Sequence, residues 1–215
     1  MPLQNRVNPF GNILAVSERG ACMGNRGILH GNQRNLLRYH QHKHWVICRL
    51  EAKDKQGNKI RRKPMVQTNT YTELFFLDEA TALAAGHRPC WECSRPRYKE
   101  FIHFFCLGNP DDPRQIDDIL HAERFSAHQQ DWSNKKQTRV MPIDGLPPGA
   151  FITLEPGPQA QPYLVLEDEL RPWSFGGYGE PVERPNGIEV TLLTPPSTVR
   201  ALRAGYRPKI HPEPY

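Results

Sequence analysis

The sequence has no long hydrophobic run. No segment approaches the roughly 18 apolar residues that a membrane-spanning helix needs, and the mean hydropathy is −0.66. Residues 1–16 also lack the cationic start and apolar stretch that together mark a secretory signal peptide. We therefore expect a cytoplasmic protein with no membrane partner.

Cysteine is scarce as well. A chain of 215 residues is long enough to bury a stable core without disulfides, and disulfides rarely persist in the cytoplasm. We therefore expect reduced thiols or metal ligands at the five cysteines, which are Cys22, Cys48, Cys90, Cys93 and Cys106.

No complete catalytic constellation can be read from the chain, so the sequence leaves open whether the protein is an enzyme. The charge is more informative. The 28 Lys and Arg residues exceed the 23 Asp and Glu residues, which gives a net charge of +5. A basic balance favours an anionic partner such as nucleic acid, although a charge of this size is also usual among soluble proteins.

Short segments with two different periodicities predict an α+β fold. Alternating apolar and polar residues predict strands at 44–50, 60–66, 71–77, 150–154, 163–166 and 188–193. Helical spacing, with proline and glycine near the ends, predicts helices at 78–85, 96–107, 114–127 and 197–204. The glycine-rich segments 22–30 and 173–181 are interpreted as loops, and 131–140 as a basic connector.

These elements suggest two units. We expect residues 1–130 to form one α+β domain, with an antiparallel sheet in residues 1–75 followed by helices. Residues 141–215 are expected to form a small β-rich unit packed on the first. Thr194 or Ser197 is the expected cap of the last helix.

The most informative stretch combines helix caps with a cysteine pair. Asp78 can accept hydrogen bonds from the first turn of a helix, and the alanines and leucine that follow are strong helix formers. Gly86 can take the left-handed conformation that ends a helix, and Pro89 blocks its continuation. Cys90 and Cys93 follow in a tight turn, where a CxxC can hold two thiolates on one metal ion.

The octapeptide at 82–89 recurs at 201–208 with six of eight identical positions. Glycine followed by proline is a general way to end a helix, and no period surrounds the two copies. The echo is therefore interpreted as shared helix-stop chemistry rather than as a repeat.

Residues 72–93, TELFFLDEATALAAGHRPCWEC, resemble the helix and metal turn of the Ada N-terminal domain, the methylphosphotriester repair module. The shared pattern is a strand with an aromatic residue, an alanine-rich helix and A-G-[FY]-R-P-C-x-x-C. It is carried here by Phe75 or Phe76, Ala80, Ala82, Leu83, Ala85, Gly86, Arg88, Pro89, Cys90 and Cys93. The whole chain also resembles a group of bacterial proteins.

The Ada resemblance implies a four-cysteine zinc site and a role in DNA repair. In that family two of the cysteines precede the helix as C-x-x-x-C, and one cysteine is the nucleophile. This chain has no such pair, and Cys48 is the upstream cysteine at a comparable place.

Cys90 and Cys93 are the leading metal ligands, with zinc as the expected cofactor. A thioredoxin-type redox pair is expected at the start of a helix, whereas this CxxC follows a helix, so metal is favoured. Cys48 is the third candidate, with a buried core thiol as the alternative. Five histidines are candidates for the fourth ligand, with a solvated surface position as the alternative for each. They are His30, His40, His42, His44 and His121.

A second arrangement of ligands uses a different motif. Zinc nucleobase deaminases combine H-x-E with P-C-x-x-C, where His and two Cys bind zinc and Glu moves protons. This chain has His121-Ala-Glu123 after Cys90 and Cys93, which is the reverse order. Because His121 and Glu123 are two apart in a predicted helix, their side chains point about 200° apart around its axis. We therefore predict that this arrangement does not form.

Basic and aromatic residues near the CxxC are candidates for nucleic-acid contact. Arginine and lysine can contact phosphates, and an exposed tryptophan can stack on a base. The candidates are Arg88, Arg95, Arg97, Lys99 and Trp91, and a second basic set comprises Arg34, Arg38, Lys43, Lys59, Arg61, Arg62 and Lys63. The alternatives are a solvated face for the charges and a lid over the core for Trp91, while Cys106 is assigned to the core.

Three functions remain in view. The first is a zinc-stabilised nucleic-acid-binding protein, with DNA as the expected partner. The second is a zinc-dependent enzyme that acts on nucleic acid or nucleotides by alkyl transfer, hydrolysis or deamination. The third is a structural or interaction protein whose CxxC is a relic.

Overall fold

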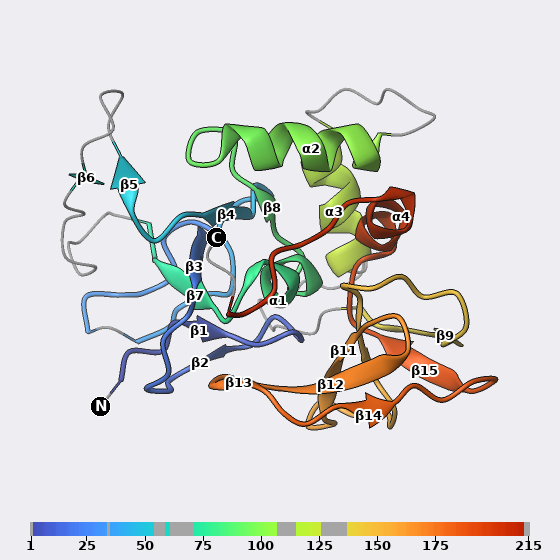
Figure 1. Cartoon of the computed structure of the whole chain (residues 1–215). Helices are drawn as coiled ribbons and strands as arrows, with labels where there is room; N and C mark the ends of the chain where they lie inside the picture. Colours follow the sequence, from blue (N-terminus) through green and yellow to red (C-terminus); the bar gives the residue numbers. More distant parts are fainter. Residues whose placement is uncertain are drawn as a thin grey trace.

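A computed structural model of the chain describes residues 2–33, 35–53, 59–60, 71–106, 115–125 and 137–212. These residues form helices and mixed sheets, which confirms the predicted α+β class. One sheet comes from the N-terminal half of the chain and a second from the C-terminal third. The helix α1 (Glu79–Ala84) contacts both sheets (Figure 1). None of the described helices has the length and apolar character needed to cross a membrane.

The N-terminal sheet has six strands in the order β2-β1-β7-β3-β4-β8. They are β1 (Arg6–Val7), β2 (Ile13–Leu14), β3 (Cys22–Asn25), β4 (Val46–Cys48), β7 (Leu74–Phe76) and β8 (Arg88–Pro89). The pairs β1–β2, β3–β4 and β3–β7 are antiparallel, as predicted, but β1–β7 and β4–β8 are parallel. The chain passes from β7 through α1 to β8, and such a crossover returns the next strand in the same direction. Because β3 is antiparallel to both β7 and β4, β7 and β4 point the same way, and β8 is therefore parallel to β4.

A separate hairpin pairs β5 (Ala52–Lys53) with β6 (Lys59–Ile60). The strand predicted at 60–66 lies outside the described residues beyond Ile60.

The prediction of a loop at 22–30 is wrong for its first half. Cys22–Asn25 is β3, which pairs with β7 on one side and with β4 on the other. Its glycine is required by close packing, because a Cβ at Gly24 would stand 2.5 Å from the Val46 carbonyl oxygen and 2.7 Å from the Phe76 ring. Glycine inside a strand often marks such a close approach.

The C-terminal sheet is antiparallel in every described pair and follows the order β13-β12-β11-β10-β15-β9, with β14 paired to β12. Three of its strands were predicted. The strands are β9 (Arg139–Pro142), β10 (Phe151–Thr153), β11 (Pro162–Val165), β12 (Glu169–Ser174), β13 (Gly177–Tyr178), β14 (Val182–Glu183) and β15 (Glu189–Leu192).

Two segments of this sheet were predicted as irregular. The glycine-rich segment 173–181 contains a tight hairpin in which Trp173 pairs with Tyr178, and residues 139–140 of the basic connector belong to β9. The hairpin is held by α1, since Trp173 Nε1 donates to Thr81 Oγ1 (3.0 Å) and the Tyr178 hydroxyl donates to Asp78 Oδ2 (2.6 Å). These partners lie about a hundred residues away, so local composition could not reveal the strands.

The helix α1 is buried on every side. Its predicted N-cap is confirmed, because Asp78 Oδ1 accepts from the Thr81 amide at 2.8 Å. Ala80 and Ala84 pack in a cluster with residues of the C-terminal sheet, whereas Ala82 and Leu83 belong to the larger core that includes the N-terminal sheet. The small side chains of α1 let both sheets approach it, and its buried polar residues Glu79 and Thr81 are hydrogen-bonded to other elements.

Three further helices, α2 (Arg95–Phe105), α3 (Ile116–Arg124) and α4 (Pro196–Ala204), lie on one side of the molecule (Figure 1). All three predicted helices are confirmed, with ends that differ by up to three residues. The expected cap of α4 is wrong. Thr194 Oγ1 instead accepts from the Phe151 amide, and the first turn of α4 is capped by Glu123 of α3, whose carboxylate accepts from the Ser197 amide (3.0 Å) and hydroxyl.

The echoed octapeptides end two helices by the same motif. The His87 amide donates to the Ala82 carbonyl and the Gly86 amide to the Leu83 carbonyl. In α4 the Tyr206 amide donates to the Ala201 carbonyl and the Gly205 amide to that of Leu202. This is the Schellman pattern, and both glycines have positive φ. The interpretation as helix-stop chemistry is confirmed.

Candidate metal centre

The side chains of Cys48, Cys90 and Cys93 come together at one end of the β4–β8 pair. Their three sulfur atoms all lie within 4.8 Å of one another, which is a group that can hold a metal ion. Around a tetrahedral zinc ion, thiolate sulfurs bound at about 2.3 Å are separated by roughly 3.8 Å. The separations in this group are compatible with three of the four positions of such a site.

Parallel strand pairing brings Cys48 and Cys90 together across 41 intervening residues. The Arg88 amide donates to the Trp45 carbonyl, and the Cys90 amide donates to the Ile47 carbonyl at 2.9 Å. The last residue of β4 therefore lies beside the first residue after β8. The prediction that Cys48 lies near the CxxC pair is confirmed.

The turn after β8 supplies the third sulfur. It closes when the Ser94 amide donates to the Cys90 carbonyl at 3.0 Å, and α2 begins at the next residue. Hydrogen bonds from Cys48 and Cys93, and from the backbone amides of Cys93 and Glu92, lower the pKa of the Cys90 thiol. Hydrogen bonds with Cys90 and Cys93, together with burial, raise the pKa of Cys48.

These opposite pKa shifts favour the thiolate at Cys90 and the neutral thiol at Cys48. Amide donors aimed at a sulfur stabilise its thiolate, and metal binding replaces the remaining thiol protons. Cys48 is buried, with 5% of its surface exposed, whereas Cys90 and Cys93 are partly exposed. An ion can therefore reach the group from the side of the turn.

The histidines proposed as fourth ligands are not part of this group. His30 contacts the Gln4 carbonyl and the Thr72 hydroxyl, and His44 Nδ1 lies 2.6 Å from Asp117. The His40 ring packs against Trp45, Phe125 and His121, and the His42 ring faces His44. No other His, Cys, Asp or Glu among the described residues meets the distance that joins the three cysteines.

The deaminase motif is directed elsewhere. Glu123 caps α4 through Ser197, and His121 packs against His40 and Phe125. Both side chains are already used in packing and capping, in line with the prediction that they do not join Cys90 and Cys93.

Two of the predicted nucleic-acid contacts need correction. Arg88 forms a bidentate ion pair with Asp117, at 2.9 and 2.6 Å. Arg97 pairs with Glu79 at 2.5 Å and with Glu100 at 2.6 Å. Only 11% of the Arg88 side chain and 16% of that of Arg97 are exposed, so these charges are compensated inside the protein.

The other three candidates remain at the surface. Trp91 is 43% exposed, at the tip of the metal turn. The Arg95 guanidinium carbon lies 4.3 Å from the centre of the Trp91 ring, and Tyr98 meets the same ring edge-on. Lys99 is exposed one turn further along α2.

Members of the second basic set have different outcomes. Lys43 pairs with Asp118 at 2.6 Å, and Arg38 is partly buried while Lys59 lies in β6. Arg34, Arg61, Arg62 and Lys63 lie outside the described residues. Cys106 packs at the edge of the main core, as predicted.

Sequence reasoning missed Asp117, the residue that organises this side of the centre. Its carboxylate is hydrogen-bonded to the side chains of both Arg88 and His44, and so it links α3 to β8 and to the segment before β4. An acidic residue in the first turn of a helix is usual on dipole grounds alone, so nothing in the sequence distinguished it.

Comparisons of the chain with family models, with curated proteins and with solved structures find no match. The resemblance to the Ada domain stays a prediction.

Proposed function

We propose that this chain is a zinc-stabilised nucleic-acid-binding protein, with DNA as the expected partner. The observation that carries the proposal is the group formed by Cys48, Cys90 and Cys93. The ion would tie β4, β8 and the start of α2 together. The exposed residues of the same turn would then contact the nucleic acid.

Zinc fits the chemistry of the donor set. Thiolates are soft ligands, and tetrahedral sulfur-rich sites select zinc or iron among the common metals. Sulfur ligands supplied by a CxxC turn and a neighbouring strand are typical of structural zinc sites. The amide bonds that stabilise the Cys90 thiolate would orient that ligand, as outer hydrogen bonds do at metal sites in general.

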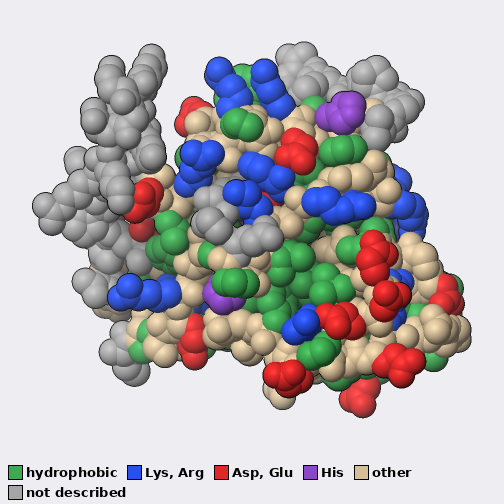
Figure 2. Space-filling view, viewed as in Figure 1, with side chains coloured by type: hydrophobic (Ala, Val, Ile, Leu, Met, Phe, Trp, Pro, Cys, Tyr) green, Lys and Arg blue, Asp and Glu red, His purple; other side chains and the backbone are tan. Residues whose placement is uncertain are grey.

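Nucleic acid fits the surface beside the metal turn. Trp91 presents an aromatic face, and Arg95 and Lys99 supply positive charge next to it. Stacking on an aromatic residue combined with a basic track is the usual way of binding a single strand. Figure 2 shows that Lys and Arg gather over the side of α2 and α4, whereas Asp and Glu gather over the C-terminal sheet. This separation of charge favours a polyanion on the helical side.

We predict that the purified full chain carries about one zinc ion per molecule. Replacing Cys48, Cys90 or Cys93 by serine should weaken zinc binding on the order of a hundredfold, because an alcohol is a poor zinc ligand. Elemental analysis and chelator competition measure this. Cys106→Ser is the matched control and should retain the metal. A chain without metal would support the relic hypothesis, and bound iron would refute zinc while leaving the site intact.

We predict binding to DNA that weakens steeply with salt, since neutralised phosphates release counterions. Fluorescence anisotropy with single- and double-stranded oligonucleotides, from 20 to 200 mM salt, measures it. The triple variant Trp91→Ala, Arg95→Gln, Lys99→Gln should bind at least tenfold more weakly, because about 1–3 kcal/mol of stacking per base is lost together with two charges. Arg171→Gln, on the C-terminal sheet, should bind like the wild type. Absence of binding to DNA and RNA at low salt would end the proposal.

One observation favours the enzyme hypothesis. A catalytic zinc has three protein ligands and an open position, and three is the number of cysteines in the group among the described residues. X-ray absorption of the zinc protein separates the two cases. Three sulfurs with one exchangeable oxygen would favour an enzyme, whereas a fourth protein ligand would favour the binding module.

A further inference from the structure

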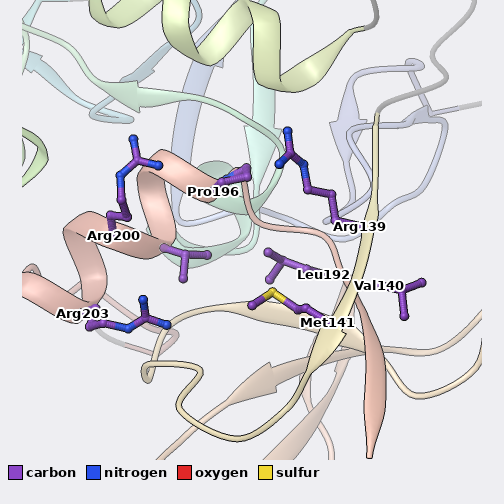
Figure 3. Close-up of a pocket in the computed structure, with 8 residues that line it drawn as sticks. Arg139, Val140, Met141, Leu192, Pro196, Arg200 and Arg203 are labelled. Atoms are coloured by element: carbon purple, nitrogen blue, oxygen red, sulfur yellow. The ribbon is translucent and has the colours of Figure 1, made fainter.

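A pocket of about 280 Å³ opens between β9, β15 and α4. It is formed entirely by the second half of the chain. Its lining consists of three arginines and five apolar residues, namely Arg139, Arg200, Arg203, Val140, Met141, Leu192, Pro196 and Val199. Figure 3 shows the guanidinium groups of Arg139 and Arg200 on two sides of the cavity and that of Arg203 on a third, around Met141 and Leu192.

Among the described residues, the three arginines of this pocket form no ion pair. Arg139 forms no ion pair or side-chain hydrogen bond within the part of the chain that the structure describes. Arg200 donates to the Ser197 hydroxyl at 2.8 Å, and Arg203 to the Gly145 carbonyl at 3.1 Å. Both partners are neutral, and none of the described residues that line the cavity carries a carboxylate. Guanidinium groups arranged around one cavity repel one another.

The carboxylate of Glu123, which contacts the first turn of α4, is already engaged. Glu123 accepts from the amide and the hydroxyl of Ser197 and so caps α4 from the side of α3. The helix N-terminus, which often receives an anion, is therefore occupied by the protein itself. An incoming anion would be bound by the arginines.

The bottom of the pocket is apolar. Leu192 and Val199 are buried and belong to the main core, and the partly buried Met141 packs against it. The pocket thus combines an apolar surface with three guanidinium groups, which suits a ligand with a carbon body and a strongly anionic end.

We propose that this pocket binds an organic phosphate monoester. The phosphate would lie between Arg139 and Arg200 with Arg203 nearby, and the carbon body would rest on Met141, Leu192 and Val199. A phosphate monoester carries nearly two charges and three acceptor oxygens, which matches three guanidiniums around one cavity better than a carboxylate does. Arginine forks bind such oxygens in pairs. The ligand could be a free nucleotide or the 5′-phosphate of a strand, and in the second case the pocket deepens the proposed function.

The test uses the full chain and three small probes: phenyl phosphate, inorganic phosphate and phenol. Methyl NMR of methionine follows the Met141 signal, assigned with Met141→Leu. We expect phenyl phosphate to shift this signal and to bind at least tenfold more tightly than inorganic phosphate, while phenol has no effect. Arg139→Gln and Arg200→Gln should each weaken phenyl phosphate binding at least tenfold. An unmoved Met141 signal, equal affinity for the two phosphates, or unchanged binding by both variants would overturn the proposal.

Two further measurements separate the sources and the two sites. Adenosine monophosphate is compared with an oligonucleotide that carries either a 5′-phosphate or a 5′-hydroxyl. Displacement of phenyl phosphate by the monophosphate alone supports a free nucleotide, and a tenfold preference for the 5′-phosphorylated strand supports a strand end. Arg95→Gln should leave phenyl phosphate binding unchanged, so failure at the metal turn and failure at this pocket are distinguishable.

Discussion

Gly86 has two constraints that no other residue type satisfies. Its φ is +88°, and a Cβ at this position would stand 2.6 Å from Cδ of Arg124, whose guanidinium donates to the Gly86 carbonyl. Arg124 is buried and lies 4.1 Å from the centre of the Trp45 ring, so its side chain has little room to shift.

We predict that Gly86→Ala lowers the free energy of unfolding by about 3 kcal/mol. Roughly 1–2 kcal/mol arises from a side chain in the left-handed region, and the remainder from displacing a packed arginine. Gly145→Ala is the matched control, since Gly145 has a φ of +73° with nothing within 4 Å of its Cβ position. Urea unfolding of both variants measures the difference. Equal losses would show that the Arg124 contact carries no cost.

For single residues, the sequence predicted roles that depend on neighbouring residues, but not the partners that come from distant parts of the chain. Asp78 as a cap and Gly86 as a stop follow from the residues beside them, and both predictions are confirmed. Arg88 and Arg97 looked like surface charges, but each meets an acidic residue from another element. An arginine reveals its partner only once the chain has folded.

The elements divide in the same way. The helices were predictable: α2, α3 and α4 have apolar stripes over nine or more residues, and α1 is rich in alanine and begins at the cap Asp78. The strands β3, β8, β12 and β13 contain glycine or proline and are set by their neighbours: β8 by pairing with β4, and the β12–β13 hairpin by hydrogen bonds to α1. The cap of α4 is likewise supplied by a different helix. The three cysteines of the metal group were predicted, Cys90 and Cys93 from their local pattern and Cys48 from its place upstream of the helix. The parallel pairing of β4 with β8 that brings Cys48 to the turn was not predicted.

In the molecule as a whole, buried cationic groups gather where α3 meets the segment before β4. Arg26 and Arg124 lie 4.0 and 4.1 Å from the Trp45 ring. Within the described residues, four buried polar atoms of this region have no hydrogen-bond partner: Arg26 Nη2, Arg124 Nε, His42 Nδ1 and His121 Nδ1. Additional positive charge is unfavourable here, because burial disfavours the charged form and the neighbouring cations repel it.

The histidines of this region should make the protein sensitive to acid. Burial, followed by the charges of His121, Arg26, Arg124 and His42, lowers the pKa of His40 to about 4. Burial also lowers the pKa values of His42 and His121. In the unfolded chain these side chains titrate near pH 6.5. Between pH 6.5 and about 4 the unfolded state therefore binds more protons than the folded state, so stability is present above pH 6.5 and is lost as the pH falls through this window.

We predict that the free energy of unfolding decreases steadily from pH 7 to pH 4.5, and that His40→Gln reduces this slope. Glutamine cannot take up the proton, so the part of the slope that belongs to residue 40 disappears even if the variant is less stable at every pH. Urea unfolding at several pH values measures the slope directly. His103→Gln is the matched control, because His103 is exposed on α2 and should leave the slope unchanged. An identical pH dependence in the wild type and His40→Gln would show that protonation of His40 is not coupled to folding.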